Sequence, residues 1–139
     1  MITAVDTSVL LDVFGGDPTY GPRSAAALRA CLAEGRLVAC AVVWAEVGGF
    51  FPSSAQVQEV MARLGIQYDV ILLDAALEAS TAWKVYRQRG GHRLRMIPDF
   101  LIGAHALHQA ERLLTRDRGF YRTSFSKLVV LDPTAPTVA

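Results

Sequence analysis

Short apolar runs alternate along this chain with longer stretches in which apolar residues recur every three or four positions. The short runs are rich in β-branched residues and are typical of buried strands. We predict these strands at residues 2–5, 37–42, 67–72, 112–114 and 128–131. The longer stretches predict helices at residues 9–14, 23–33, 43–50, 55–64, 75–88 and 98–110. Such alternation favours an α/β fold with a parallel sheet of four to five strands and helices on both faces.

Local signals mark several helix starts. Ser53 and Gln56 have the spacing of a capping box, and Asp74 has the character of an N-cap residue. Pro98 suits the first turn of the helix predicted at 98–110.

Length and composition indicate one globular domain of 139 residues, 52% hydrophobic and 19% charged. We expect that domain at residues 1–132 and a loose tail at 133–139. The longest uninterrupted apolar stretch, 37–45, is too short to cross a bilayer, and the N-terminus lacks the pattern of a secretory signal. Cys31 and Cys40 lie in apolar surroundings without metal-site spacing, which favours buried thiols. We therefore expect a cytoplasmic protein without membrane contact.

The formal net charge of +1 conceals an asymmetry. Residues 84–127 hold ten of the fourteen basic residues and only three acids. A basic region on a nearly neutral domain is typical of proteins that bind a polyanion, although a solvated face paired to acids elsewhere is an equally good interpretation.

Four carboxylates follow the predicted strands or open a helix. Asp6 follows the first strand, Glu46 lies a turn beyond the second, Asp99 opens the helix after Pro98, and Asp117 follows the strand at 112–114. Right-handed crossovers bring the ends of parallel strands and the starts of the following helices to one sheet edge, where ligands of such folds bind. Each acid also has a local interpretation, as a helix cap, a turn residue or, for Glu46, half of a partly buried ion pair.

Convergence of the four acids would require a cation, because like charges at short distance raise one another's pKa. Oxygen ligands without His or Cys favour Mg²⁺ or Mn²⁺ over Zn²⁺. Such an ion can activate water and stabilise a leaving oxygen. Together with the basic region, this chemistry favours hydrolysis of nucleic-acid phosphodiester bonds.

The segments VDTSVLLDVF, VVWAEV, IPDFLIGAHAL and LLTRDRGFYR, in this order, resemble the PIN-domain ribonucleases and in particular the VapC-type toxins of bacterial toxin–antitoxin pairs. The resemblance runs from about residue 2 to residue 131. It implies a PIN-like three-layer sandwich with strand order near 3-2-1-4-5. It also implies a metal-dependent endoribonuclease, a homodimer and a cognate antitoxin, with DNA contacted only through that antitoxin.

By position, Asp6, Glu46, Asp99 and Asp117 fall on the acidic quartet of that family. We expect the three aspartates to ligate Mg²⁺ or Mn²⁺, and Glu46 to complete the ligand set or orient the attacking water. Hydroxyls beside the acids and nearby arginines complete the expected site. Supporting contacts to the ligands are expected from Thr7, Ser8 and Thr115, and contacts to RNA phosphates from Arg93, Arg95, Arg116 and Arg118.

Other classes fit less well. A phosphoacceptor receiver domain needs a lysine after the last strand, but Lys127 precedes it, and a dehalogenase-type phosphatase needs DxD where the chain has DTS. The pair His105 and His108 lacks a third zinc ligand. A non-catalytic PIN-fold module that binds RNA or protein is the remaining alternative.

Overall fold

The computed structural model describes residues 1–90 and 96–135. Five parallel strands form one sheet in the order β3-β2-β1-β4-β5, which confirms the expected topology. The strands are β1 (Ile2–Val5), β2 (Arg36–Cys40), β3 (Ile66–Asp69), β4 (Arg112–Leu114) and β5 (Val130–Leu131). The first strand in the sequence is therefore the central one, with β2 and β4 on its two sides.

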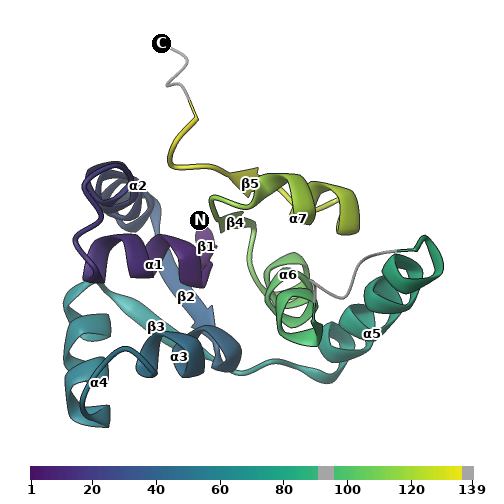
Figure 1. Ribbon diagram of the computed structural model, residues 1–139, viewed down its shortest axis with the longest axis horizontal. Helices are drawn as coiled ribbons and strands as arrows, with labels where there is room; N and C mark the ends of the chain where they lie inside the picture. The colour runs from purple at the N-terminus through teal and green to yellow at the C-terminus, as the bar shows by residue number, and fades with distance from the viewer. Residues whose placement is uncertain (91–95, 136–139) are drawn as a thin grey trace.

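Seven helices connect the strands within the described residues. They are α1 (Thr7–Phe14), α2 (Gly21–Glu34), α3 (Ala41–Gly48), α4 (Ser54–Arg63), α5 (Leu73–Gln88), α6 (Ile97–Gln109) and α7 (Arg118–Ser124). Figure 1 shows α1 to α4 gathered on one side of the molecule and α5 to α7 on the other. This division follows from the topology. The connections from β1 through β2 to β3 run in one direction along the sheet, and those from β3 through β4 to β5 run in the other. Right-handed crossovers in opposite directions place their helices on opposite faces.

Several predicted boundaries differ from the structure. Helix α7 was not predicted, because its sequence RGFYRTS holds only two large apolar residues, adjacent to each other, and so shows no helical period. The N-cap of α5 is Leu72, and Asp74 instead lies in the first turn. The apolar run at 37–45 contains both β2 and the start of α3, since the strand passes into the helix without a loop. Ser53 does cap α4, accepting a hydrogen bond from the Gln56 N–H.

The core forms around the central strands. Val5 and Leu114 are paired across β1 and β4 and are almost fully buried. Beyond this pair, the Asp6 N–H donates to the Leu114 carbonyl at 2.9 Å, which continues the pairing one residue past β1. The sheet thus fixes the backbone of Asp6 relative to the residues that follow β4.

Helix α6 approaches the C-terminal part of the chain very closely at Gly103. A Cβ atom at this position would lie 2.3 Å from Cε2 of Phe125. Only glycine permits this separation, so Gly103 sets the distance between α6 and the segment that follows α7. Asp99 lies in the first turn of the same helix α6, and Asp117 immediately precedes α7.

Both cysteines are buried free thiols, as predicted. No helix among residues 1–90 and 96–135 is long and apolar enough to cross a membrane. Within the expected tail, the Thr134 carbonyl accepts a hydrogen bond from Nη1 of Arg23 on α2 at 3.2 Å.

Candidate active site

Asp6 lies at the junction of β1 and α1 and has only 7% of its surface exposed. Its Oδ1 accepts a hydrogen bond from the Thr7 N–H at 2.8 Å, so Asp6 caps α1 as the local interpretation predicted. Its Oδ2 accepts from the Thr115 hydroxyl at 2.6 Å. Burial nevertheless raises the pKa of Asp6 from 3.8 to about 6, and the charges of Asp99 and Glu46 add to the rise. The hydrogen bond at the helix cap therefore does not offset the cost of burying the negative charge of Asp6.

Thr115 connects two of the predicted acids. Its fully buried hydroxyl donates to Asp6 and accepts from the Asp117 N–H at 2.9 Å. The position of Thr115, one residue beyond β4, brings it beside the end of β1. Thr115 thus links the side chain of Asp6 to the backbone of Asp117.

Glu46 lies on α3 and is exposed, so the prediction of partial burial was wrong. The short helix turns this side chain outward from the apolar residues that surround it in sequence. Its Oε1 accepts a hydrogen bond from the Thr7 hydroxyl at 2.8 Å. Thr7 therefore joins two acids, because its N–H bonds Asp6 and its hydroxyl bonds Glu46.

Asp99 and Asp117 are both half-buried. Asp99 lies in the first turn of α6, after Pro98, as the sequence predicted. Asp117 immediately precedes α7. The structure brings Asp99 within electrostatic reach of Asp6, since its negative charge contributes to the raised Asp6 pKa.

Tyr121 is a residue of this site that the sequence analysis missed. Its side chain is 1% exposed, and it lies one helical turn beyond Asp117 on α7. Burial raises its phenol pKa well above 10, and the negative charges of Asp6, Asp99 and Asp117 act in the same direction. Acids from three elements thus lie within electrostatic reach of one phenol. A tyrosine in an unpredicted helix gave no sequence signal of this position.

The hydroxyl oxygen of Ser8, the third predicted supporting residue, is buried and has no hydrogen-bond partner among the described residues.

The arginines that were predicted to contact RNA have different surroundings. Arg116 forms a bidentate ion pair with Asp12, through Nε to Oδ2 at 2.7 Å and Nη2 to Oδ1 at 2.9 Å. Nε of Arg118 lies 3.7 Å from Oδ2 of Asp132. Arg93 and Arg95 lie outside the described residues. The RNA-binding interpretation of Arg116 has no support in this geometry, because two of its donor groups are already bonded to Asp12.

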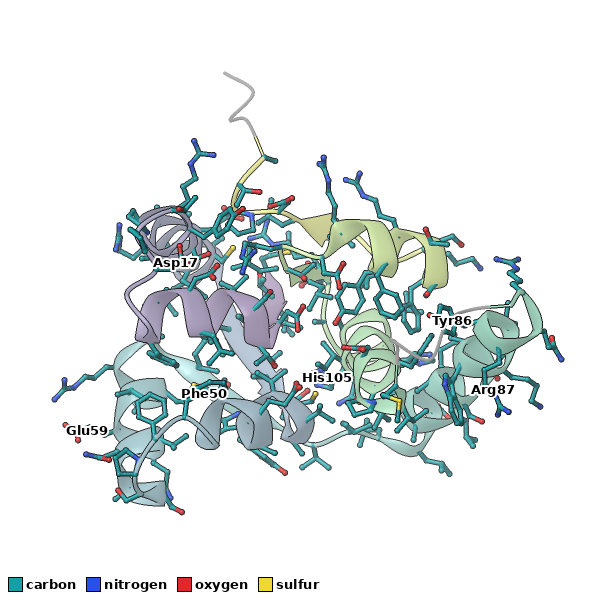
Figure 2. All side chains as sticks on the ribbon, in the orientation of Figure 1. Asp17, Phe50, Glu59, Tyr86, Arg87 and His105 are labelled. Atoms are coloured by element: carbon teal, nitrogen blue, oxygen red, sulfur yellow. The ribbon has the colours of Figure 1, made fainter. Side chains whose placement is uncertain are left out.

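The histidines of α6 take part in contacts between elements. Nε2 of His105, at the centre of Figure 2, lies 2.7 Å from Oδ2 of Asp69 at the end of β3. Nε2 of His108 lies 3.5 Å from Oε1 of Glu78 on α5. These contacts attach α6, which carries Asp99, to its neighbours.

The donor set of the site suits a hard cation. Among residues 1–90 and 96–135, no three His, Cys, Asp or Glu side chains lie close enough together to form a ready-made metal cage. Mg²⁺ does not need one, because it usually takes one or two carboxylates and keeps several waters. Asp6 offers a buried oxygen ligand with acidic neighbours, and a cation beside it would lower its raised pKa by favouring the ionised form. The residues therefore fit Mg²⁺ or Mn²⁺ held by few protein ligands.

Comparisons with known proteins agree with this fold. The PIN domain model matches residues 3–126. The chain is similar to the crystal structure of VapBC2 from Rickettsia felis bound to a promoter DNA fragment, with a TM-score of 0.73 and 17% identity over 95% of this chain and 98% of that one. It is also similar to VapBC-1 from nontypeable Haemophilus influenzae, with a TM-score of 0.70 and 19% identity over 97% and 100% of the two chains.

A toxin–antitoxin complex from Klebsiella pneumoniae has a TM-score of 0.66 and 23% identity over 96% of this chain and 99% of that one. At these identities the likeness shows a shared fold. A search of curated protein sequences finds no significant match.

Proposed function

The chain belongs to the PIN-domain family, and from this membership and the acidic sheet edge we propose that it is a Mg²⁺- or Mn²⁺-dependent endoribonuclease. The observation that carries the proposal is the environment of Asp6. This carboxylate is buried beside two further acids, and its pKa is raised to about 6. A buried anion without charge compensation costs stability, and clusters of this kind are typical of functional sites.

Each acid has a role in the proposed reaction. Asp6 would ligate the metal directly, Asp99 and Asp117 would hold it directly or through its bound waters, and Glu46 would orient the attacking water or complete the ligand set. The bound ion supplies charge stabilisation and lowers the pKa of water. Thr115 orients Asp6 and fixes the backbone of Asp117 through its two hydrogen bonds. Because water is the nucleophile and the ribose 2′-hydroxyl takes no part, the products carry a 5′-phosphate and a 3′-hydroxyl.

We further propose that the protein is the toxin of a toxin–antitoxin pair and is neutralised by a cognate antitoxin. This proposal is supported by the likeness to chains of VapBC and other toxin–antitoxin complexes over 95% or more of this chain. Any contact with DNA would then be made by the antitoxin.

A homodimer is also proposed. It is supported by exposed apolar side chains at the β3 edge of the sheet and the start of α5, among them Val70 at 61%, Leu72 at 59% and Leu73 at 72% exposed. A second copy is the simplest partner that could cover them. Sedimentation equilibrium of the purified chain, with Leu73→Asp as the disrupting variant, measures this association.

The decisive experiment for the nuclease function is cleavage of end-labelled RNA by the antitoxin-free protein, with Mg²⁺, with Mn²⁺ and with EDTA. The compared variants are Asp6→Asn, Asp99→Asn and the matched control Asp74→Asn, which alters an exposed aspartate on α5. We expect discrete metal-dependent cuts, reduced by about two orders of magnitude or more in the first two variants and unchanged in the third.

A folded protein that neither cuts RNA nor binds Mn²⁺ by calorimetry would support the alternative, a non-catalytic PIN-fold module. Cleavage that survives in EDTA and in Asp6→Asn would contradict the metal-dependent mechanism. Chemical analysis of the product ends separates hydrolysis by water from attack by the 2′-hydroxyl.

A further inference from the structure

Residues 115–117 connect β4 to α7, and the side chain of their middle residue is held by contacts that the proposed reaction does not use. The Arg116 guanidinium bonds both carboxylate oxygens of Asp12, at 2.7 and 2.9 Å. Its Cζ also lies 4.2 Å from the ring centroid of Tyr20. Asp12 is only 4% exposed and accepts a further hydrogen bond from Ser24. The guanidinium is therefore attached to a carboxylate that is itself held in place.

The contacts of residues 115 and 116 lie at the two ends of α1. Thr115 bonds Asp6, the N-cap of this helix, at 2.6 Å, and Arg116 bonds Asp12, six residues later. Six helical residues span about 9 Å, so two consecutive residues of the chain are attached to α1 at well-separated points. One attachment would let the segment rotate about it. Two attachments fix its direction as well as its position.

The direction of this segment affects the site because Asp117 follows immediately. The Asp117 N–H donates to the Thr115 hydroxyl at 2.9 Å, and Asp117 is the residue from which α7 begins. The backbone torsion angles of Arg116 therefore help to set where the Asp117 carboxylate lies relative to Asp6. The Arg116 side chain restrains those angles, because bidentate pairing with a buried carboxylate fixes the orientation of the planar guanidinium.

We propose that Arg116 is a positioning residue of the metal site, whose attachment to Asp12 holds Asp117 in place relative to Asp6 for the binding of a shared cation. This inference rests on the proposed nuclease function and adds to it a residue that contacts neither the metal nor the RNA. Asp12 belongs to the same arrangement, because it anchors the guanidinium at the far end of α1.

A role for Arg116 through its charge alone predicts the opposite change in metal affinity. Removing a positive charge from the neighbourhood of a cation site favours binding of the cation, whereas a displaced ligand weakens it. In Asp12→Leu/Arg116→Met both charges of the ion pair are removed, so the net charge is unchanged and no buried charge is left unpaired. This double variant therefore separates an effect of position from effects of charge and stability.

The test measures the Mn²⁺ affinity of the full, antitoxin-free chain by calorimetry and its stability by urea denaturation. The variants are Asp12→Leu/Arg116→Met and Arg116→Lys, which keeps the charge but not the planar fork. The matched control is Glu34→Leu/Arg112→Met. It removes an ion pair of 2.9 Å at the start of β4, the opposite end of this strand from residues 115–117.

We expect the double variant to be nearly as stable as the unaltered protein but to bind Mn²⁺ about tenfold more weakly, as is typical when a residue that supports metal ligands is lost. Arg116→Lys should weaken Mn²⁺ binding about threefold, because an ammonium group cannot bond both oxygens of Asp12 in a fixed geometry. The control should bind Mn²⁺ as the unaltered protein does.

Unchanged or tighter Mn²⁺ binding in both Arg116 variants would overturn the proposal, since the ion pair would then serve stability alone. An equal loss of Mn²⁺ affinity in the control would also overturn it, because the effect would reflect general loosening of the sheet.

The failure of this inference is distinguishable from failure of the nuclease proposal. A protein whose Mn²⁺ affinity falls in Asp6→Asn but not in the Arg116 variants retains the metal-dependent function and loses the positioning role. A protein that neither binds Mn²⁺ nor cuts RNA loses both.

Discussion

Asp6 and Asp12 lie at the two ends of α1 and are buried to a similar degree, with 7% and 4% of their surfaces exposed. Their partners differ in charge. Asp12 accepts two hydrogen bonds from the Arg116 guanidinium and a third from the Ser24 hydroxyl at 2.8 Å. Asp6 accepts hydrogen bonds from Thr7 and Thr115 and has acids nearby. One helix thus carries a compensated carboxylate and an uncompensated one.

Two consecutive residues after β4 produce this difference. Thr115 donates to Asp6, and Arg116 donates to Asp12. The comparison indicates that burial alone does not distinguish a structural acid from a functional one. The sign of the charge that faces the carboxylate makes the distinction, because an uncompensated buried anion is stable only when something else, such as a metal ion, provides the missing charge.

The largest expected effect on stability comes from the ion pair between Asp12 and Arg116. Replacing Arg116 by methionine leaves Asp12 buried without its cation, and we expect this to lower the free energy of unfolding by about 3 to 5 kcal/mol. Urea denaturation followed by circular dichroism measures the loss. In the double variant Asp12→Leu/Arg116→Met, most of the stability should return, because no buried charge remains. A single variant as stable as the unaltered protein would show that Asp12 has another source of compensation.

Asp6→Asn, in contrast to the loss of the Arg116 guanidinium, should raise the free energy of unfolding of the metal-free protein. The raised pKa means that the folded state binds more protons than the unfolded state between pH 3.8 and about 6, so stability is full below this window and is lost as pH rises through it. The loss amounts to about 3 kcal/mol at neutral pH. Asparagine carries no charge, so the variant should be more stable than the unaltered protein by up to about that amount at neutral pH and about equal to it in acid.

Thermal unfolding in EDTA over a pH series tests this expectation. Added Mn²⁺ should stabilise the unaltered protein, because an ion that binds only the folded state raises its stability. The difference in stability between this protein and Asp6→Asn should therefore become smaller. A constant difference between the two proteins at all pH values would contradict a raised Asp6 pKa.

The sequence predicted more of the fold than of the contacts. Strand–helix alternation was enough to predict the parallel sheet, because the apolar period and the turn residues mark strands and helices. The strand order 3-2-1-4-5 came from the resemblance to PIN-domain proteins. It did not predict α7, and consequently it missed Tyr121. The two large apolar residues of α7 are adjacent and show no helical period, and packing rather than propensity stabilises a helix this short.

The environment of a side chain was equally inaccessible from sequence. Glu46 is surrounded by apolar residues in the chain, but the face of α3 on which it lies makes it exposed. Arg116 stands beside a candidate acid in sequence, yet its guanidinium reaches Asp12, over a hundred positions away. Long-range pairing of this kind depends on tertiary packing, which neighbouring residues do not encode.

A smaller effect is expected from Thr115→Val, which keeps the shape of the side chain and removes its hydroxyl. The Asp117 N–H loses its acceptor and Asp6 loses a donor that lowers its pKa. We expect a cost of about 2 kcal/mol and a further rise in the Asp6 pKa. The control is Ser24→Ala, which removes one of the three hydrogen-bond donors to Asp12 and should leave Mn²⁺ binding unaltered. Calorimetry with Mn²⁺ separates the two, and equal Mn²⁺ affinities in both variants would contradict a role for Thr115 at the metal.

The smallest expected effect compares two tyrosines. Tyr121 is buried within electrostatic reach of Asp6, whereas Tyr20 contacts Arg116 through its ring face at 4.2 Å. Tyr121→Phe should therefore cost about 1 kcal/mol of stability and weaken Mn²⁺ binding, because it removes a polar hydroxyl from the surroundings of Asp6 and makes them less favourable to the ionised carboxylate. Tyr20→Phe retains the ring and should change neither quantity. If both variants bind Mn²⁺ as the unaltered protein does, the phenol of Tyr121 only fills space. A difference confined to Tyr121→Phe would place this hydroxyl with Thr115 among the groups that keep Asp6 ready for a cation.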